Sequence, residues 1–191
     1  MYDHFKNVLL TFSLFLFCAC AQKKTIFSYP PLPGYDLTNP VMIHLQTNLD
    51  EISGIAYYAK DESIFAVDDE EGVLYKIYIR KQVKVKKWKF SIDGDYEDIV
   101  LHDSTFYVLR SDGNIKIFTF LSKDSLKSEE AAVAVPGKND FETLYYDSNL
   151  QRIILICKEC ESDSSNTTSA YTVDPDNYAI FRYTFFYYKC R

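Results

Sequence analysis

Histidine is scarce in this sequence, and only one close pair of cysteines is available outside the N-terminal region. Among 191 residues there are three histidines and five cysteines. A zinc site takes four nitrogen or sulfur ligands, which usually come as two close pairs. Cys157 and Cys160 form one pair, and only Cys190 and distant histidines remain to complete it. The sequence therefore argues against zinc, and it leaves open whether Cys157 and Cys160 form a local disulfide or stay reduced.

The sequence also lacks a nucleophile with a base placed to activate it, and it lacks an excess of positive charge. His102 is the one histidine near the repeated motif described below, and we expect it in a turn. Lys and Arg number 21 against 27 Asp and Glu, for a net charge of −6, so there is no electrostatic case for nucleic acid. The basic run at 80–87 predicts an edge or outer strand protected by lysine, with a docking patch as the alternative.

No apolar run is long enough for an ordinary membrane-spanning helix, which needs about 20 apolar residues. The run from Val8 to Ala19 follows the positive charge of Lys6 and has the length of a signal-peptide core. It ends in Ala19-Cys20, which resembles a bacterial lipobox, although Phe17 departs from the usual leucine. The resemblance implies cleavage before Cys20 and lipid attachment to it. An ordinary secretory signal and an uncleaved anchor are the alternatives.

Proline marks the segment that follows the predicted signal peptide. Residues 21–40 contain Pro30, Pro31, Pro33 and Pro40, which disfavour both helices and central strands. We interpret 1–20 as a lipoprotein signal peptide, 21–40 as a Pro-rich tether and 41–191 as the folded domain. The alternative for 21–40 is an N-terminal extension that packs on the domain.

An acidic motif recurs along the domain at a nearly constant interval. It reads acid, any residue, Ser or Glu, any residue, Ile or Leu, and it occurs at 51–55, 95–99 and 140–144, with steps of 44 and 45 residues. The chain then reads strand, turn, strand, with Gly72 and Gly113 in turns where a positive φ is expected. A period of about 40–45 residues built from short strands is typical of β-propeller blades. The sequence therefore predicts an all-β fold, a partial β-propeller of about three to four four-stranded blades that begin near Leu49, Asp95 and Asp140; a non-repeating all-β fold is the alternative.

These motifs resemble those of the SdiA-regulated domain family. The resemblance rests on Leu49 to Tyr57, on Asp68 to Glu70, on Asp95 to Ile99 and on Phe141 to Leu144. It implies an exported and often lipid-anchored protein with a six-bladed propeller, similar to NHL-type propellers and to the esterase-like phytase domain. Six such blades need roughly 260 residues, so we expect an incomplete, apparently truncated propeller over 41–191. The alternative is that the tail, from Tyr178 to Tyr188, is the closing strand of a smaller assembly.

The repeated acids are the candidate site. In a propeller the start of each inner strand faces the central channel, so equivalent positions converge. Glu51, Asp95 and Asp140 would form one ring, and Glu97 and Glu142, with Ser53, a second. Alternate residues on a strand share a face, and clustered carboxylates attract a hard cation such as Ca²⁺. The alternative is that the acids bond backbone amides of the neighbouring blade as a structural latch.

The function that follows is a binding or scaffold module of the bacterial cell envelope, lipid-anchored to the inner or outer membrane. Its ligand, a small molecule or a protein, is not identified by the sequence, and Ca²⁺ is the expected ion at the five acids. A Ca²⁺-dependent hydrolase of phosphate esters or lactones is one alternative, with Ca²⁺ as Lewis acid. A non-functional fragment of a longer gene product is the other.

We predict that the chain is lipidated at Cys20. Metabolic labelling with a fatty-acid analogue should mark the wild-type protein, and Cys20→Ala should abolish the label because the substitution removes the sulfur to which the lipid is attached. Equal labelling of the two proteins would contradict the prediction.

Overall fold

The structure, a computed structural model, describes residues 32–36, 38–45, 49–79, 83–122, 125–132, 137–164 and 166–187, with the backbone alone for Ala132, Ile180 and 182–187. The chain divides into two compact units, Met1–Met42 and Ile43–Arg191, and every strand named below lies in the second. Within the described ranges, no helix has the length and apolar character needed to cross a membrane. The predicted signal peptide, with Cys20, and also Cys190 lie outside the described residues.

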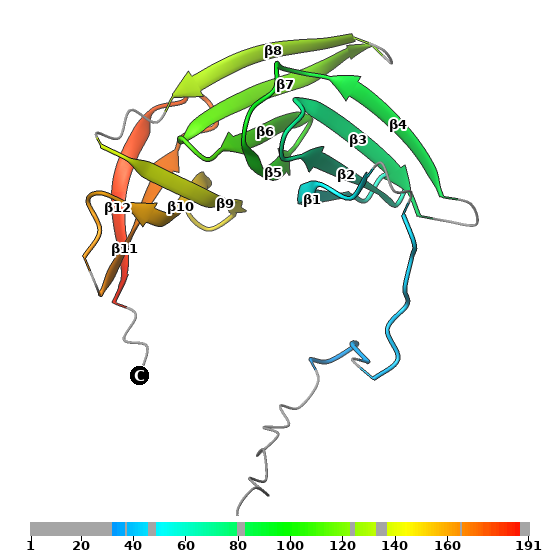
Figure 1. The fold of residues 1–191 in the computed structure, drawn as a ribbon, viewed down its shortest axis with the longest axis horizontal. Helices are drawn as coiled ribbons and strands as arrows, with labels where there is room; N and C mark the ends of the chain where they lie inside the picture. Colours follow the sequence, from blue (N-terminus) through cyan, green and yellow to red (C-terminus); the bar gives the residue numbers. More distant parts are fainter. Residues whose placement is uncertain are drawn as a thin grey trace, which may run out of the picture. The chain divides into compact units, whose positions relative to one another are not determined.

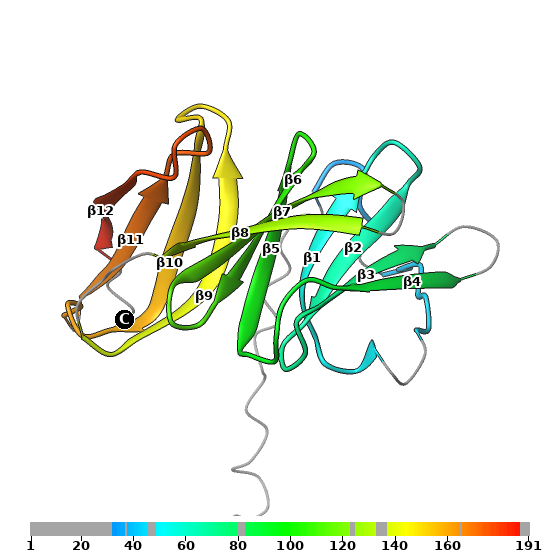
Figure 2. The ribbon, with the colours of Figure 1, turned by 90° about the horizontal axis from the view of Figure 1, so that it is seen from above.

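Twelve strands in the described ranges form three antiparallel sheets, each built from four consecutive strands. Figures 1 and 2 show the sheets side by side; in Figure 1 they follow an arc, and the first strand of each sheet lies on its inner side. The predicted all-β, partial propeller-like fold is thus confirmed, including its four-stranded blades. The strands are β1 (Ile52–Tyr58), β2 (Ser63–Asp68), β3 (Val73–Tyr78) and β4 (Lys84–Lys89); β5 (Tyr96–His102), β6 (Thr105–Arg110), β7 (Asn114–Ser122) and β8 (Ser125–Ala132); and β9 (Asn139–Asp147), β10 (Arg152–Cys160), β11 (Thr167–Val173) and β12 (Ile180–Tyr187).

The outer strands refine two predictions. The lysine-rich run ends in β4, the edge strand of the first sheet, as predicted. The aromatic tail forms β12, which pairs with β11 from Val173 back to Thr167 and completes the third sheet. The described residues therefore make three four-stranded blades, and the tail supplies the fourth strand of the third blade.

The two predicted glycine turns have different physical causes. Gly113 has a φ of +85°, as expected for a hairpin turn, but Gly72 does not have a positive φ. Gly72 is needed because another segment passes close to it: a Cβ there would lie 2.5 Å from the carbonyl oxygen of Ile92. Its own carbonyl accepts hydrogen bonds from the N–H groups of Phe90 (2.8 Å) and Ser91 (3.2 Å). The location of this turn was predicted correctly, and the reason for its glycine was not.

The second sheet is apolar on both faces, because it packs between the other two. Alternate residues of a strand point to opposite faces. On β6, Phe106 and Val108 belong to the core shared with the first sheet, whereas Tyr107 and Leu109 belong to the core shared with the third. All four are buried. A strand buried on both faces reads as a continuous apolar run, which explains why Phe106 to Leu109 lacks polar alternation.

Backbone hydrogen bonds join each blade to the next at the starts of the inner strands. The N–H of Tyr96, which opens β5, donates to the carbonyl of Asp69 in the first blade (2.8 Å). In the same way the N–H of Phe141 in β9 donates to the carbonyl of Ser111 in the second blade (2.9 Å). The same contact therefore repeats at both blade junctions, and it fixes the start of each inner strand against the previous sheet.

Asp98 adds a side-chain latch between the second and third blades. Its Oδ2 accepts a hydrogen bond from the N–H of Leu144 on β9, and its Oδ1 accepts one from the N–H of Ile99, each at 2.8 Å. Burial raises the pKa of Asp98, and the two N–H donors oppose that rise. At the equivalent position of the first blade stands Gly54, where a Cβ would lie 2.6 Å from the Cα of Asp98. The junction between the first two blades is thus too close for any side chain at residue 54.

We predict that Asp98→Ala destabilises the fold by about 2 kcal/mol, because it leaves two part-buried N–H groups without their acceptor. Urea unfolding curves measure the change. The control is Asp93→Ala, which removes an exposed ion pair with Lys89 (2.7 Å) and should destabilise the fold far less than Asp98→Ala. Equal destabilisation by the two variants would show that Asp98 is not a latch.

Candidate functional site

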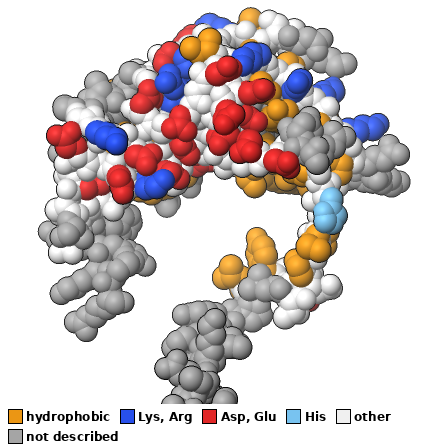
Figure 3. Space-filling model, viewed as in Figure 1, with side chains coloured by type: hydrophobic (Ala, Val, Ile, Leu, Met, Phe, Trp, Pro, Cys, Tyr) orange, Lys and Arg blue, Asp and Glu red, His pale blue; other side chains and the backbone are white. Residues whose placement is uncertain are grey.

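The acidic motif residues of the second and third blades lie at the starts of two neighbouring inner strands. Asp95 immediately precedes β5 and Glu97 is its second residue, while Asp140 and Glu142 lie near the start of β9. β5 and β9 are in contact. The space-filling view in Figure 3 shows that acidic side chains predominate over basic ones on this face of the arc. The fold therefore brings carboxylates from two blades to one end of the sheets.

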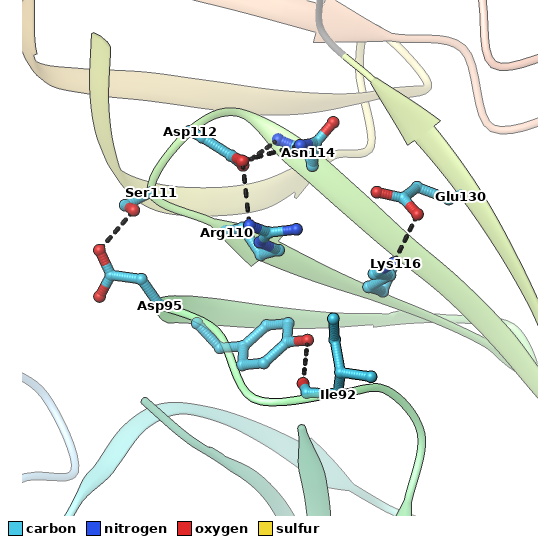
Figure 4. Close-up of polar contacts among 9 residues, drawn as sticks. Ile92, Asp95, Arg110, Ser111, Asp112, Asn114, Lys116 and Glu130 are labelled. Carbon is cyan, nitrogen blue, oxygen red and sulfur yellow. Dashed lines mark hydrogen bonds and ion pairs between the residues drawn. The ribbon is translucent and has the colours of Figure 1, made fainter. Parts of the chain in front are cut away.

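Three of the predicted ligands form one group. One carboxylate oxygen each from Glu97, Asp140 and Glu142 lies within 4.8 Å of the others, and all three residues are half-buried. Asp95 lies at the edge of this group, where its Oδ2 accepts a hydrogen bond from the hydroxyl of Ser111 at 2.5 Å (Figure 4). We call Asp95, Glu97, Asp140 and Glu142 the acidic cluster.

The acidic cluster is electrostatically coupled through Glu97. Burial raises the pKa of Glu97 to about 7, together with the negative charges of Glu142, Asp95 and Asp140 and a hydrogen bond with Asp95. A carboxyl group with this pKa is partly protonated at neutral pH. The cluster thus holds a proton that a positive charge placed among the four acids would displace.

One lysine from the third sheet offsets part of the negative charge. Lys158 Nζ lies 2.5 Å from Glu142 Oε1 and 3.5 Å from Asp140 Oδ2. The hydrogen bond to Glu142 and the charges of Asp140 and Glu142 raise the pKa of Lys158, which keeps it protonated. Lys158 is therefore the countercharge that the folded chain itself supplies to the cluster.

A β-bulge places Lys158 at the cluster. Along β10 the pairing with β9 shifts register: Cys157 lies opposite Phe141, and Glu159 lies opposite Asp140. Lys158, between them, has no opposite residue on β9. A bulge of this kind bends the strand and redirects a side chain. Cys157 and Cys160 are joined by a disulfide with their Cα atoms 5.8 Å apart, so the bond spans the bulge. The question that the sequence left open about this pair is resolved in favour of the disulfide.

An open groove adjoins the acidic cluster. It has a volume of about 560 Å³ and is lined by residues of both blades, among them Asp95, Ser111, Lys138 and Asp140. Figure 4 shows polar contacts around Ser111, which lines the groove: Asp95 contacts Ser111, and Arg110 pairs with Asp112 at 3.1 Å. The acids therefore border open space large enough for a small molecule or a hydrated ion.

The structure regroups the predicted rings. Asp140 of the predicted first ring joins Glu97 and Glu142 of the second, because Asp140 lies within strand β9 whereas its counterpart Asp95 lies before β5. Among the described residues, the group does not include Glu51 of the first blade. Glu51 is exposed, and its backbone carbonyl accepts a hydrogen bond from the N–H of Asp69 (3.0 Å). Whether any of the five acids binds a metal stays a prediction.

The roles of two residues, Asp98 and Lys158, were not predicted from the sequence. Asp98 is part of the motif, but nothing in the sequence showed that this acid, and not its neighbours, would reach the next blade. In the sequence, nothing distinguishes Lys158 except its position inside the Cys157–Cys160 segment. Its role depends on a bulge, and a bulge depends on pairing with a strand about 16 residues away in the chain.

Comparison with known proteins supports the fold and no more. No protein-family profile and no curated protein sequence matches the chain. The fold is similar to that of a luciferin-regenerating enzyme, with 18% identity and a TM-score of 0.51, over 70% of this chain and 45% of that one. A protein from Bacteroides uniformis ATCC 8492 assigned as a 6-phosphogluconolactonase gives 11% identity and a TM-score of 0.47, over 69% of this chain and 39% of that one. The chain thus spans less than half the length of either structure.

We predict a pH dependence of stability that originates at Glu97. Its folded-state pKa of about 7 lies above the ordinary value of 4.5, so its contribution to stability is full below the ordinary value and is lost as the pH rises through about 7. Melting curves between pH 5 and pH 8 should show the wild type losing stability relative to Glu97→Gln as the pH increases. The variant Glu51→Gln should retain the wild-type profile. If the difference in stability between wild type and Glu97→Gln does not change with pH, Glu97 is not the origin of the pH dependence and the prediction is wrong.

Proposed function

We propose that this chain is an exported binding module of the propeller class, lipid-anchored to a bacterial cell-envelope membrane through Cys20, and that its acidic cluster binds Ca²⁺. The observation that carries the proposal is the group formed by Glu97, Asp140 and Glu142, whose carboxylate oxygens lie within 4.8 Å of one another across two blades. The resemblance of the motifs to the SdiA-regulated domain family supports both the envelope location and the propeller class.

The donor set fits a hard cation. Ca²⁺ takes six to eight oxygen ligands and accepts carboxylates together with water. Glu97, Asp140 and Glu142 offer such oxygens, and the adjoining groove of about 560 Å³ leaves room for water ligands. A bound ion of two positive charges would stabilise the ionised form of Glu97 and would compete with Lys158 for Glu142 and Asp140. Soft metals are disfavoured, because the sulfurs of Cys157 and Cys160 are used in a disulfide.

The disulfide also supports export. Disulfides form and persist in oxidising compartments such as the bacterial periplasm, and they are rare in the cytosol. The Cys157–Cys160 bond is therefore consistent with a domain that folds outside the cytoplasm. The acidic character of the face in Figure 3 supports a partner that is a cation, a small ligand or a protein, and it disfavours nucleic acid.

A Ca²⁺-dependent hydrolase of phosphate esters or lactones is the second candidate. One observation favours it: a carboxyl group with a pKa near 7, such as Glu97, is suited to act as a general acid or base at neutral pH. The luciferin-regenerating enzyme is an enzyme by its name, but a likeness of 18% identity carries the fold alone. We rank binding first, because it needs only the carboxylates whose geometry is described.

Ca²⁺ should stabilise the folded protein, because the ion binds a site that exists only in the native state. The expected gain is about 2.7 kcal/mol at a hundredfold excess over the dissociation constant. Thermal melts of the full chain with Ca²⁺ and with a chelator measure it. The double variant Glu97→Gln/Glu142→Gln keeps the side-chain shapes, removes two charges and should lose the response. Glu51→Gln, which removes an exposed motif acid outside the group, should keep it. If wild type and double variant respond equally to Ca²⁺, the proposal fails.

A further inference from the structure

A second concave site lies between the first two sheets, at the opposite end of the strands from the acidic cluster. It has a volume of about 420 Å³ and is lined by residues of both sheets. On β5 its lining includes Leu101, four residues beyond Glu97, which corresponds to about 13 Å along the strand. We call it the aromatic pocket. Its volume falls in the range of small-molecule sites.

The walls of the pocket are aromatic side chains that the core leaves partly open. Phe65 is buried at the base, where its ring centroid lies 5.5 Å from that of Tyr58 and 6.3 Å from that of Phe120. On the outer side Trp88 packs edge-on against Phe120, with ring centroids 5.0 Å apart. Tyr58, Trp88 and Phe120 are only half-buried. Aromatic surface exposed in a concavity is what a flat apolar ligand would cover.

Two lysines stand side by side in the same pocket. Lys76 on β3 and Lys86 on β4 are direct cross-strand partners, so both side chains lie on one face of the sheet. Like charges in such a pair repel each other. Lys76 is buried and its charge is compensated by Asp61, with Nζ 2.6 Å from Oδ2. The Nζ of Lys76 also lies 4.6 Å from the ring centroid of Tyr58.

Among the residues that the structure describes, no carboxylate compensates Lys86 in this way. Its side chain is exposed, and its Nζ lies 5.9 Å from the ring centroid of Tyr78. With the residues that the structure describes, it forms no ion pair. Asp103, on the opposite rim, lies 3.7 Å from a ring nitrogen of His102. Among the described lining residues, the pocket thus combines an aromatic cavity with one lysine, Lys86, that pairs with no described carboxylate, and with one exposed carboxylate, Asp103.

From these observations we propose that the aromatic pocket binds a small amphipathic anion: a flat apolar body with a single carboxylate or sulfonate group. The apolar body would lie against Tyr58, Trp88 and Phe120, and the anionic group would lie beside the ammonium group of Lys86. An anion there also relieves the repulsion between the two lysines. The proposal is independent of the acidic cluster and of Ca²⁺.

Trp88 makes the pocket directly observable, because it is the only tryptophan in the chain. The probe is 1-anilinonaphthalene-8-sulfonate, titrated into the purified full chain. Binding should saturate at one equivalent and should quench Trp88 emission by energy transfer to the probe. N-phenyl-1-naphthylamine has the same ring system without the sulfonate, and it should bind at least about tenfold more weakly, a difference of about 1.4 kcal/mol.

Two variants with the same change in charge locate the anion. Lys86→Gln should weaken binding of the sulfonate about five- to tenfold and leave N-phenyl-1-naphthylamine unaffected. Lys87→Gln is the matched control, since Lys87 is the next residue of β4, points to the other face and is also exposed; it should change neither affinity. The proposal is overturned if the sulfonate does not bind saturably, if it binds without quenching Trp88, or if the two variants or the two probes behave alike.

Discussion

The whole arrangement depends on packing apolar sheet faces against one another. The four-stranded sheet of the second blade has apolar side chains on both faces, and exposing either face to water is unfavourable. On β6 of this blade, Val108 points toward the first sheet and Leu109 toward the third, so burying both residues requires a sheet on each side. The inter-blade hydrogen bonds, such as that from Phe141 to Ser111, then fix how far one sheet slides along the next. Packing supplies most of the stability, and these bonds supply the register.

That register also determines the chemistry of the acidic cluster. Because the start of β9 is held against the end of β6, Asp140 and Glu142 come to rest beside Glu97 and not at another level of the strand. Bringing like charges together costs free energy. The folded chain limits that cost in two ways: Glu97 retains a proton to higher pH, and the bulge in β10 brings Lys158 into contact with Glu142. A cation at the cluster would take over both roles.

Periodic features were predictable from the sequence, and non-local contacts were not. The steps of 44 and 45 residues predicted the four-stranded blades and the starts of their inner strands, since each blade is one local unit. The acids were placed at the correct end of the strands. Which of these acids would lie together in one group was not predictable, because Asp140 lies within a strand whereas Asp95 precedes one. Lys158 and Asp98 could not be assigned either, since their partners lie on other strands or blades.

The aromatic pocket shows the same limit. Tyr58, Trp88 and Phe120 come from three strands of two sheets, and no spacing in the sequence links them. Their partly exposed rings line a cavity of about 420 Å³ between the two sheets. A site of this kind becomes visible only when side chains from both sheets are placed together.

The most direct test of the account locates an ion at the acidic cluster. Crystals of the protein soaked in Tb³⁺, a Ca²⁺ substitute with strong anomalous scattering, would be measured at the terbium edge. We predict an anomalous peak between the carboxylates of Glu97, Asp140 and Glu142, with the ammonium group of Lys158 moved away from Glu142. A structure in which Lys158 still bridges Glu142 and Asp140, with no anomalous peak at the cluster, would contradict the account and identify these acids as structural.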